Sequence, residues 1–148
     1  MGKTESRELG IVKTFKAPID LIWKVWTNSE RIAIWWGPKG FTNTIHHMDF
    51  EEGGKWKFTM HGPDGTNFPN KSIFKEIIPF KKIVLEHFNP HFFSTVLFEA
   101  KGEETQIDWT LLFDTAEMRE IIVKVHKADE GQKQNIEKLD RYISKLKS

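Results

Sequence analysis

The sequence predicts an α+β fold in which a strongly curved antiparallel β-sheet of about seven strands wraps around a long C-terminal helix. Three observations lead to this prediction. Apolar residues recur at helical spacing through residues 115–146, strand-like stretches follow one another from residue 41 to 114, and two short helical stretches follow a first strand. A sheet with one apolar face must cover that face. Only the C-terminal helix is long enough to do so.

Length and composition narrow the classes of protein that this chain can be. Its 148 residues suit one domain, 1–148, with residues 1–8 expected as a loose N-terminal tail. There is no cysteine, so disulfides and thiolate metal sites are excluded. The net charge is +1 with both signs interspersed, which does not indicate a nucleic-acid partner. The chain begins without an apolar signal core and has no apolar run near the roughly 20 residues of a membrane helix. We therefore expect a cytoplasmic protein without membrane insertion.

The N-terminal part is predicted to form a strand followed by two short helices. Residues 9–16 are the strand, with its apolar side chains on one face. Pro18 suits the first position of a helix, where its missing N–H would be unpaired anyway. Asn28 or Ser29 can cap the second helix, and Gly37-Pro38 ends it.

The middle of the chain is predicted to be a series of antiparallel strands. Glu51-Glu52-Gly53-Gly54 and Pro63-Asp64-Gly65 have the composition of hairpin turns. Between them, large apolar residues alternate with polar ones, as in a strand with one buried face. The further predicted strands cover residues 70–78, 83–88, 92–100 and 105–113.

The C-terminal stretch is predicted to be one helix with a weak middle. Asp114 or Thr115 can cap its start. Its apolar face comprises Met118, Ile122, Val125, Ile136, Leu139, Ile143 and Leu146. Small and polar residues interrupt this face at Ala128, Asp129, Gly131, Gln132 and Asn135. A helix that packs at both ends and is small between them can bridge a hollow, so we expect a cavity here.

Short motifs spread along the chain carry a resemblance to a known family. The first group is Phe15, Ala17-Pro18, Trp23, Trp26-Thr27 and Trp35-Trp36-Gly37-Pro38. The second group is Gly53-Gly54-Lys55-Trp56, Met60-His61-Gly62-Pro63-Asp64-Gly65, and Phe74-Lys75-Glu76-Ile77 with Pro79. With these motifs the chain resembles bacterial proteins similar to the activator of heat-shock protein 90 ATPase, a family of the START-like (SRPBCC, helix-grip) superfamily. The resemblance extends from about Leu9 to Leu146.

The resemblance implies a helix-grip fold with a cavity between the sheet and the long helix. Relatives in the superfamily bind lipids, hormones, polyketides and other apolar molecules, so a small apolar ligand is the partner that the resemblance implies. Heat-shock protein 90 is a second implied partner. The eukaryotic activator resembles this chain only in its C-terminal domain. Because these 148 residues leave no room for its separate N-terminal domain, we expect weak or no stimulation of heat-shock protein 90 ATPase by this chain.

A set of residues is predicted to line the cavity. Trp35 and Trp36 are adjacent, so both rings cannot face the same core, and one is expected at a mouth or a partner surface. The large apolar side chains on the predicted strands could instead fill a close-packed core and leave no cavity. The full predicted set is Trp35, Trp36, Trp56, Phe58, Met60, Phe74, His87, Trp109, Ala128, Gly131 and Gln132.

The sequence shows no convincing catalytic constellation. His87 is expected to point inward, where an imidazole can hydrogen-bond a ligand or act as a base, and His61 is a weaker candidate. No spacing indicates a metal site, no nucleophile elbow is present, and no cofactor is expected. The leading hypothesis is therefore a module that binds an apolar or amphipathic small molecule. Two alternatives stay open, namely a co-chaperone and an enzyme such as a cyclase or hydrolase of an apolar substrate.

Overall fold

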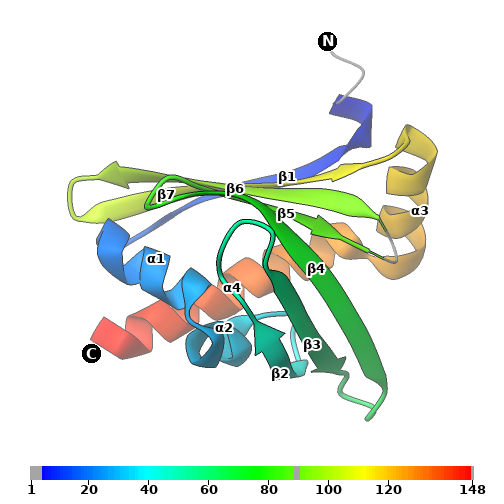
Figure 1. Cartoon of the computed structure of the whole chain (residues 1–148), viewed down its shortest axis with the longest axis horizontal. Coiled ribbons are helices and arrows are strands. Elements are labelled where there is room, and N and C mark those ends of the chain that lie inside the picture. Colours follow the sequence, from blue (N-terminus) through cyan, green and yellow to red (C-terminus); the bar gives the residue numbers. More distant parts are fainter. Residues whose placement is uncertain (1–4, 89–90, 148) are drawn as a thin grey trace.

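The computed structural model describes residues 5–88 and 91–147 and places seven antiparallel strands in one curved sheet (Figure 1). The strand order is β1-β7-β6-β5-β4-β3-β2, so only β1 and β7 pair across a long sequence separation. The strands are β1 (Glu8–Phe15), β2 (Thr42–Met48), β3 (Lys55–His61), β4 (Asn67–Ile78), β5 (Lys82–His87), β6 (Phe92–Lys101) and β7 (Glu104–Phe113).

The helices lie at the concave side and at one end of this sheet (Figure 1). They are the 3-10 helix η1 (Glu5–Arg7) and the α-helices α1 (Ile19–Thr27), α2 (Ser29–Trp35), α3 (Ala116–His126) and α4 (Ala128–Lys147). The predicted fold class is confirmed, with α4 held by the sheet and two short helices after the first strand. Within the described ranges, no helix is long and apolar enough to cross a membrane.

The start of the chain differs from the loose tail expected for residues 1–8. Residues 1–4 lie outside the described residues, but η1 covers residues 5–7 and Glu8 already pairs with Leu112 of β7. Arg7 Nη1 donates to the carbonyl oxygens of Phe113 and Asp114, each at 3.4 Å. These main-chain and side-chain contacts tie residues 7 and 8 to the end of β7.

The C-terminal helix is not continuous, and the prediction of one helix over residues 115–146 is wrong at Lys127. This residue has φ 54° and ψ 40°, the left-handed conformation that ends α3, and α4 begins at the next residue. The break falls where the apolar face is weakest, so little packing is lost by turning the chain there. Thr115 caps α3 by accepting from the Met118 N–H at 3.0 Å.

The change of direction at Lys127 also alters which apolar residues are buried. Ile136, Leu139 and Ile143 of α4 are buried against the sheet, as the spacing predicts. The prediction that Ile122 and Val125 are buried as well is wrong, since Ile122 is only partly buried and Val125 is 66% exposed, and Leu146 on the predicted apolar face is 39% exposed. No residue of α3 is buried. The helical residues that are fully buried in the core therefore come from α1, α2 and α4, and α3 adds only the partly buried Met118, Ile122 and Val123.

A cluster of indole rings joins α1 and α2 to the sheet. Asn28 caps α2 through its side-chain oxygen, which accepts from the Arg31 N–H at 3.1 Å. At the other end of α2, Trp35 is 1% exposed and donates its Nε1–H to the Val25 carbonyl oxygen at 3.0 Å. Its ring lies edge-on to Trp26, with centroids 4.7 Å apart. This packing fixes the chain that leads from α2 to β2.

His91 links the hairpin between β5 and β6 to the end of β7. Its Nδ1 lies 2.8 Å from Asp114 Oδ1, and its Nε2 lies 2.7 Å from Glu86 Oε2. The other carboxylate oxygen, Glu86 Oε1, lies 3.7 Å from Lys75 Nζ. The hydrogen bond to Glu86, followed by the one to Asp114, raises the pKa of His91 above its ordinary value of 6.5. The folded protein therefore favours the protonated imidazole, which can donate to both carboxylates.

We expect the thermal stability gained from His91 to decrease with rising pH. Because the pKa is raised in the folded state, the stabilisation is fully present below about pH 6.5 and is lost as the pH rises through the raised pKa. The melting temperature of the wild type should therefore exceed that of His91→Gln most at about pH 6 and least at about pH 9. Melting curves recorded across this range test it, and a difference that stays constant or grows with pH would contradict it.

Candidate functional site

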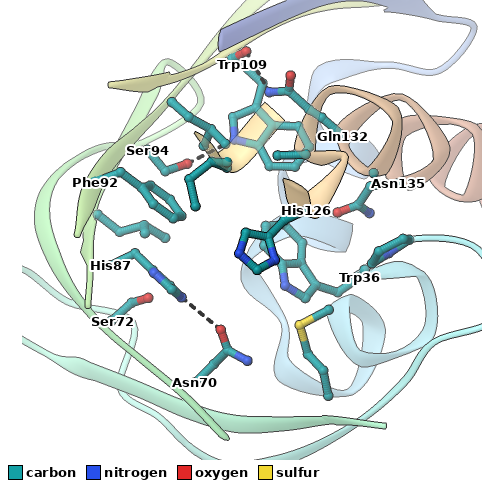
Figure 2. Close-up of a pocket in the computed structure, with 18 of the residues that line it drawn as sticks. Trp36, Asn70, Ser72, His87, Phe92, Ser94, Trp109, His126, Gln132 and Asn135 are labelled. Carbon is teal, nitrogen blue, oxygen red and sulfur yellow. Dashed lines mark hydrogen bonds between the residues drawn. The ribbon is translucent and has the colours of Figure 1, made fainter. Parts of the chain in front are cut away.

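A cavity of about 270 Å³ lies between the concave face of the sheet and the junction of α3 and α4 (Figure 2). Its wall is mostly apolar, with a few polar side chains from the sheet and from α4. The lining residues are Trp36, Gly37, Pro38, Trp56, Phe58, Met60, Asn70, Ser72, Leu85, His87, Phe92, Ser94, Trp109, Leu111, Phe113, Ile122, His126, Lys127, Ala128, Gly131, Gln132 and Asn135.

The sheet register explains why space remains at this place. Ser72 of β4 lies directly between Trp56 of β3 and His87 of β5 in the pairing of the strands. Ser94 of β6 pairs with Leu85 on one side and Leu111 on the other. Both serines are inward-facing and buried, at 1% and 4% exposure. In each set of cross-strand neighbours, a serine therefore stands between two larger side chains. The space above each serine is volume that the neighbouring side chains do not fill.

Helix α4 leaves space on the opposite wall. Gly131 has no side chain, and a Cβ built there would meet Pro38 at 3.7 Å, an ordinary contact. Ala128 begins α4 and adds only a methyl group to the wall. The cavity therefore lies where small residues of α4 face small residues of the sheet.

Most of the residues predicted to line a cavity are placed around this one, and two are not. Trp35 is held in the core by its bond to Val25, and its neighbour Trp36 reaches the cavity instead. Phe74 lies two residues from Ser72 along β4 and lines a separate hollow of about 20 Å³. The predicted residues that line the main cavity are Trp36, Trp56, Phe58, Met60, His87, Trp109, Ala128, Gly131 and Gln132.

Several lining residues are not among those predicted from the sequence, including Ser72, Ser94, Asn70, Phe92 and His126. Ser72 and Asn70 are in phase with Phe74 along β4, and Ser94 is in phase with Phe92 along β6. A polar residue at an inward phase was therefore the available signal. His126 could not be placed this way, because its position depends on the break at Lys127.

Hydrogen bonds to protein groups fix several of the polar side chains of the cavity, those of Ser94, Gln132 and Asn135 among them (Figure 2). Trp109 Nε1–H donates to Ser94 Oγ at 2.9 Å, and the Trp109 carbonyl oxygen accepts from Gln132 Nε2 at 3.2 Å. Asn135 Nδ2 donates to the Trp35 carbonyl oxygen at 3.0 Å. Because both amide groups of α4 are oriented by a main-chain carbonyl, their nitrogen and oxygen atoms cannot exchange places without losing a bond.

His87 is hydrogen-bonded to a neighbouring strand and stacked on another ring. Its Nε2 lies 2.8 Å from Asn70 Oδ1, while Asn70 Nδ2 donates to the Phe68 carbonyl oxygen at 2.9 Å. The oxygen of Asn70 is therefore the atom that faces the imidazole, and His87 Nε2 carries the proton that it accepts. The His87 ring lies 4.5 Å from that of Phe92 at an angle of 15°. His87 is thus held rigidly against the wall.

The rim formed by residues 36–41 is attached to α4 by a half-buried lysine. Lys138 Nζ donates to the carbonyl oxygens of Trp36, Pro38 and Phe41, at 3.1, 3.3 and 3.1 Å. Burial, and then the charge of Arg141, lower the pKa of Lys138 below its ordinary value. With three donors directed at three carbonyls of one loop, this ammonium group holds Trp36 and Pro38 in the cavity wall.

The remaining polar groups do not form a metal or catalytic centre. Within residues 5–88 and 91–147, no group of three His, Asp or Glu residues could hold a metal ion. His61 does not line the cavity. Its Nε2 lies 2.7 Å from Thr44 Oγ1, and its Nδ1 lies 2.6 Å from Asn67 Oδ1. A larger hollow of about 610 Å³ beside β6 is bounded by exposed residues such as Phe80, Leu97 and Glu99, and is a surface groove.

Comparisons with known proteins agree with this architecture. A family model described as "Activator of Hsp90 ATPase homolog 1-like protein" matches residues 16–144. A protein from Arthrobacter aurescens has a similar solution structure, with a TM-score of 0.90, 23% identity, and coverage of 98% of this chain and 90% of the other. A crystal structure from Nitrosomonas europaea has a TM-score of 0.86 and 20% identity, covering 96% and 97%.

A third similar structure is that of an AHSA1-like protein from Aeromonas hydrophila, with a TM-score of 0.75, 16% identity, and coverage of 94% of this chain and 93% of the other. At these identities the solved structures show the fold alone. No curated protein sequence matches the chain.

Proposed function

Because the chain belongs to the family of Activator of Hsp90 ATPase homolog 1-like proteins, we propose that it holds a small, mainly apolar molecule in the cavity between the sheet and α4. The cavity itself is the observation that carries this proposal. Aromatic rings from β3, β6 and β7 and from the end of α2 form most of its wall, and a few fixed polar groups interrupt them. Small-molecule sites commonly have this composition.

The volume limits the size of the guest. An engineered apolar cavity of about 150 Å³ binds benzene. The cavity here measures about 270 Å³, nearly twice as large. The enclosed part of a ligand therefore has the bulk of roughly ten non-hydrogen atoms, by simple scaling from that case. A longer molecule would have to leave through the opening near His126 and Lys127, which are exposed.

The two alternatives have less support. A co-chaperone role needs a protein-binding surface, and the exposed apolar residues of the described chain lie on several separate elements, among them Val12 of β1, Ile34 of α2 and Phe68 of β4. An enzyme needs a group free to react, whereas His87 is already bonded to Asn70 and stacked on Phe92. The ligand-binding role uses the cavity as it stands.

Titration with 1-decanol tests the proposed function. Three of the six tryptophans, Trp36, Trp56 and Trp109, line the cavity. Filling it should exclude water from these rings and shift tryptophan emission to shorter wavelength in a saturable way. Calorimetric titration with naphthalene provides a second probe of different shape. If neither compound binds saturably, the proposed function is wrong.

A further inference from the structure

The polar groups of the cavity differ between its two walls, and this difference restricts the chemistry of the guest. On the sheet side, Ser72 is 1% exposed, and Figure 2 shows its hydroxyl directed toward the interior of the cavity. Among the residues that the structure describes, no side-chain hydrogen bond of Ser72 is found, and its Oγ is not one of the inaccessible atoms without a partner, so the hydroxyl keeps some surface toward the cavity that Ser72 lines. A buried hydroxyl without a partner is unfavourable by about 1–3 kcal/mol in general, so such a group is usually satisfied by water or a ligand.

A second hydroxyl lies on the same wall. Ser94 Oγ already accepts from Trp109 Nε1–H, which leaves the hydroxyl hydrogen of Ser94 to donate. The sheet wall therefore offers two hydroxyl groups that can donate a hydrogen bond.

The wall formed by α4 offers an acceptor. Asn135 is 4% exposed, and its Nδ2 is engaged with the Trp35 carbonyl oxygen. The Oδ1 atom is left on the cavity side, as Figure 2 shows, and has no partner among the described residues. An amide oxygen can only accept, so a group that meets Asn135 must be a donor.

Charge is confined to the opening. Among the described lining residues, the only Lys, Arg, Asp or Glu side chain is Lys127, which is exposed at the junction of α3 and α4. An ionised group placed deeper, between Ser72 and Asn135, would have no countercharge, and burying an unpaired charge is strongly unfavourable. The interior is therefore suited to a neutral guest.

From these observations we infer that the bound molecule is uncharged in its buried part, has the bulk of about two fused six-membered rings, and carries an acceptor for Ser72 and a donor for Asn135. This inference rests on the proposed function and specifies its ligand class. A hydroxylated bicyclic compound satisfies it, because a hydroxyl both donates and accepts. A bare hydrocarbon or a carboxylate does not.

Calorimetric titration with three compounds that share one ring system tests the inference. Naphthalene has no polar group, 2-naphthol has a hydroxyl that can donate and accept, and 2-naphthoate is an anion at neutral pH. We expect 2-naphthol to bind about 3–10-fold more tightly than naphthalene, as one additional neutral hydrogen bond provides. We expect 2-naphthoate to bind the weakest of the three.

The variant Ser72→Ala tests whether the Ser72 hydroxyl forms the hydrogen bond that favours 2-naphthol over naphthalene. Because the hydroxyl has no protein partner, the variant should unfold at the same urea concentration as the wild type. Its affinity for 2-naphthol should fall by about 3–10-fold, while its affinity for naphthalene stays within about twofold. Ser144→Ala, at an exposed position of α4, is the matched control and should change neither affinity.

The outcomes separate the two proposals. If naphthalene binds but 2-naphthol binds no better, or if Ser72→Ala leaves 2-naphthol unaffected, the inferred ligand class is wrong and the binding role stands. Tightest binding of 2-naphthoate would also overturn it, because the charge at the opening would then govern recognition. If neither these three compounds nor 1-decanol binds, the proposed function itself fails.

Discussion

Replacing Leu139 with alanine is expected to lower the free energy of unfolding by about 2–5 kcal/mol, the range for a leucine deleted from a packed core. Leu139 is 0% exposed and lies in the middle of α4, between the buried residues Ile136 and Ile143. Since no residue of α3 is fully buried, the buried face of α4 provides most of the packing between the C-terminal helices and the sheet. The loss should appear as a lower midpoint in urea-induced unfolding.

Leu146→Ala on the same helix is the matched control. Leu146 is 39% exposed, so its truncation removes little buried area. It should change the free energy of unfolding by about 0.5 kcal/mol or less, as surface substitutions usually do. Equal effects of the two substitutions would show that α4 does not close the core through the face described here.

Replacing Gly131 with leucine is expected to abolish binding of apolar probes. Gly131 lines the cavity from α4, and a Cβ at this position already contacts Pro38 of the opposite rim. A leucine side chain extends further into a cavity of about 270 Å³, where it occupies space that a guest needs. Titration with 1-decanol should then give no saturable shift of tryptophan emission.

Gly131→Ala separates the filling of the cavity from the change in helix propensity. Its methyl group makes only ordinary contacts with Pro38, so the probe should still bind. Alanine in a helix interior is more favourable than glycine by roughly 0.5–1 kcal/mol, so this variant should be more stable than the wild type. Unchanged binding by Gly131→Leu would contradict the location proposed for the ligand.

The sequence predicts the architecture well because the patterns that define it are local. Alternation along the strands, turn sequences between them and the cap at Asn28 each depend on a few neighbouring residues. The break at Lys127 could not be predicted in this way, since the residue is neither glycine nor asparagine and yet adopts a left-handed conformation. A weak apolar face indicated a hollow but did not indicate that the helix would end there.

The cavity lining could be predicted only in part, because it depends on register between strands. The predicted aromatic residues were chosen by their alternation within one strand. That Ser72 lies between Trp56 and His87 follows from the pairing of three strands, which the sequence of any one of them does not define. Trp35 and Trp36 illustrate the same limit. Their adjacency indicates that the rings diverge, but only the structure shows that Trp36 faces the cavity.

Lys127, in its left-handed conformation, divides the C-terminal helical segment into α3 and α4, and these two helices differ in local stability. Helix α4 carries buried leucine and isoleucine side chains, so its amide hydrogens can exchange with solvent only when the core opens. Helix α3 has no buried side chain and exposes Ile121 and Val125, so its hydrogen bonds can break in a smaller, less costly event. Because Ile122 and His126 of α3 line the cavity, local unfolding of this helix would open one wall while the sheet stays intact. Under the proposed function, a guest would then enter and leave without global unfolding of the protein.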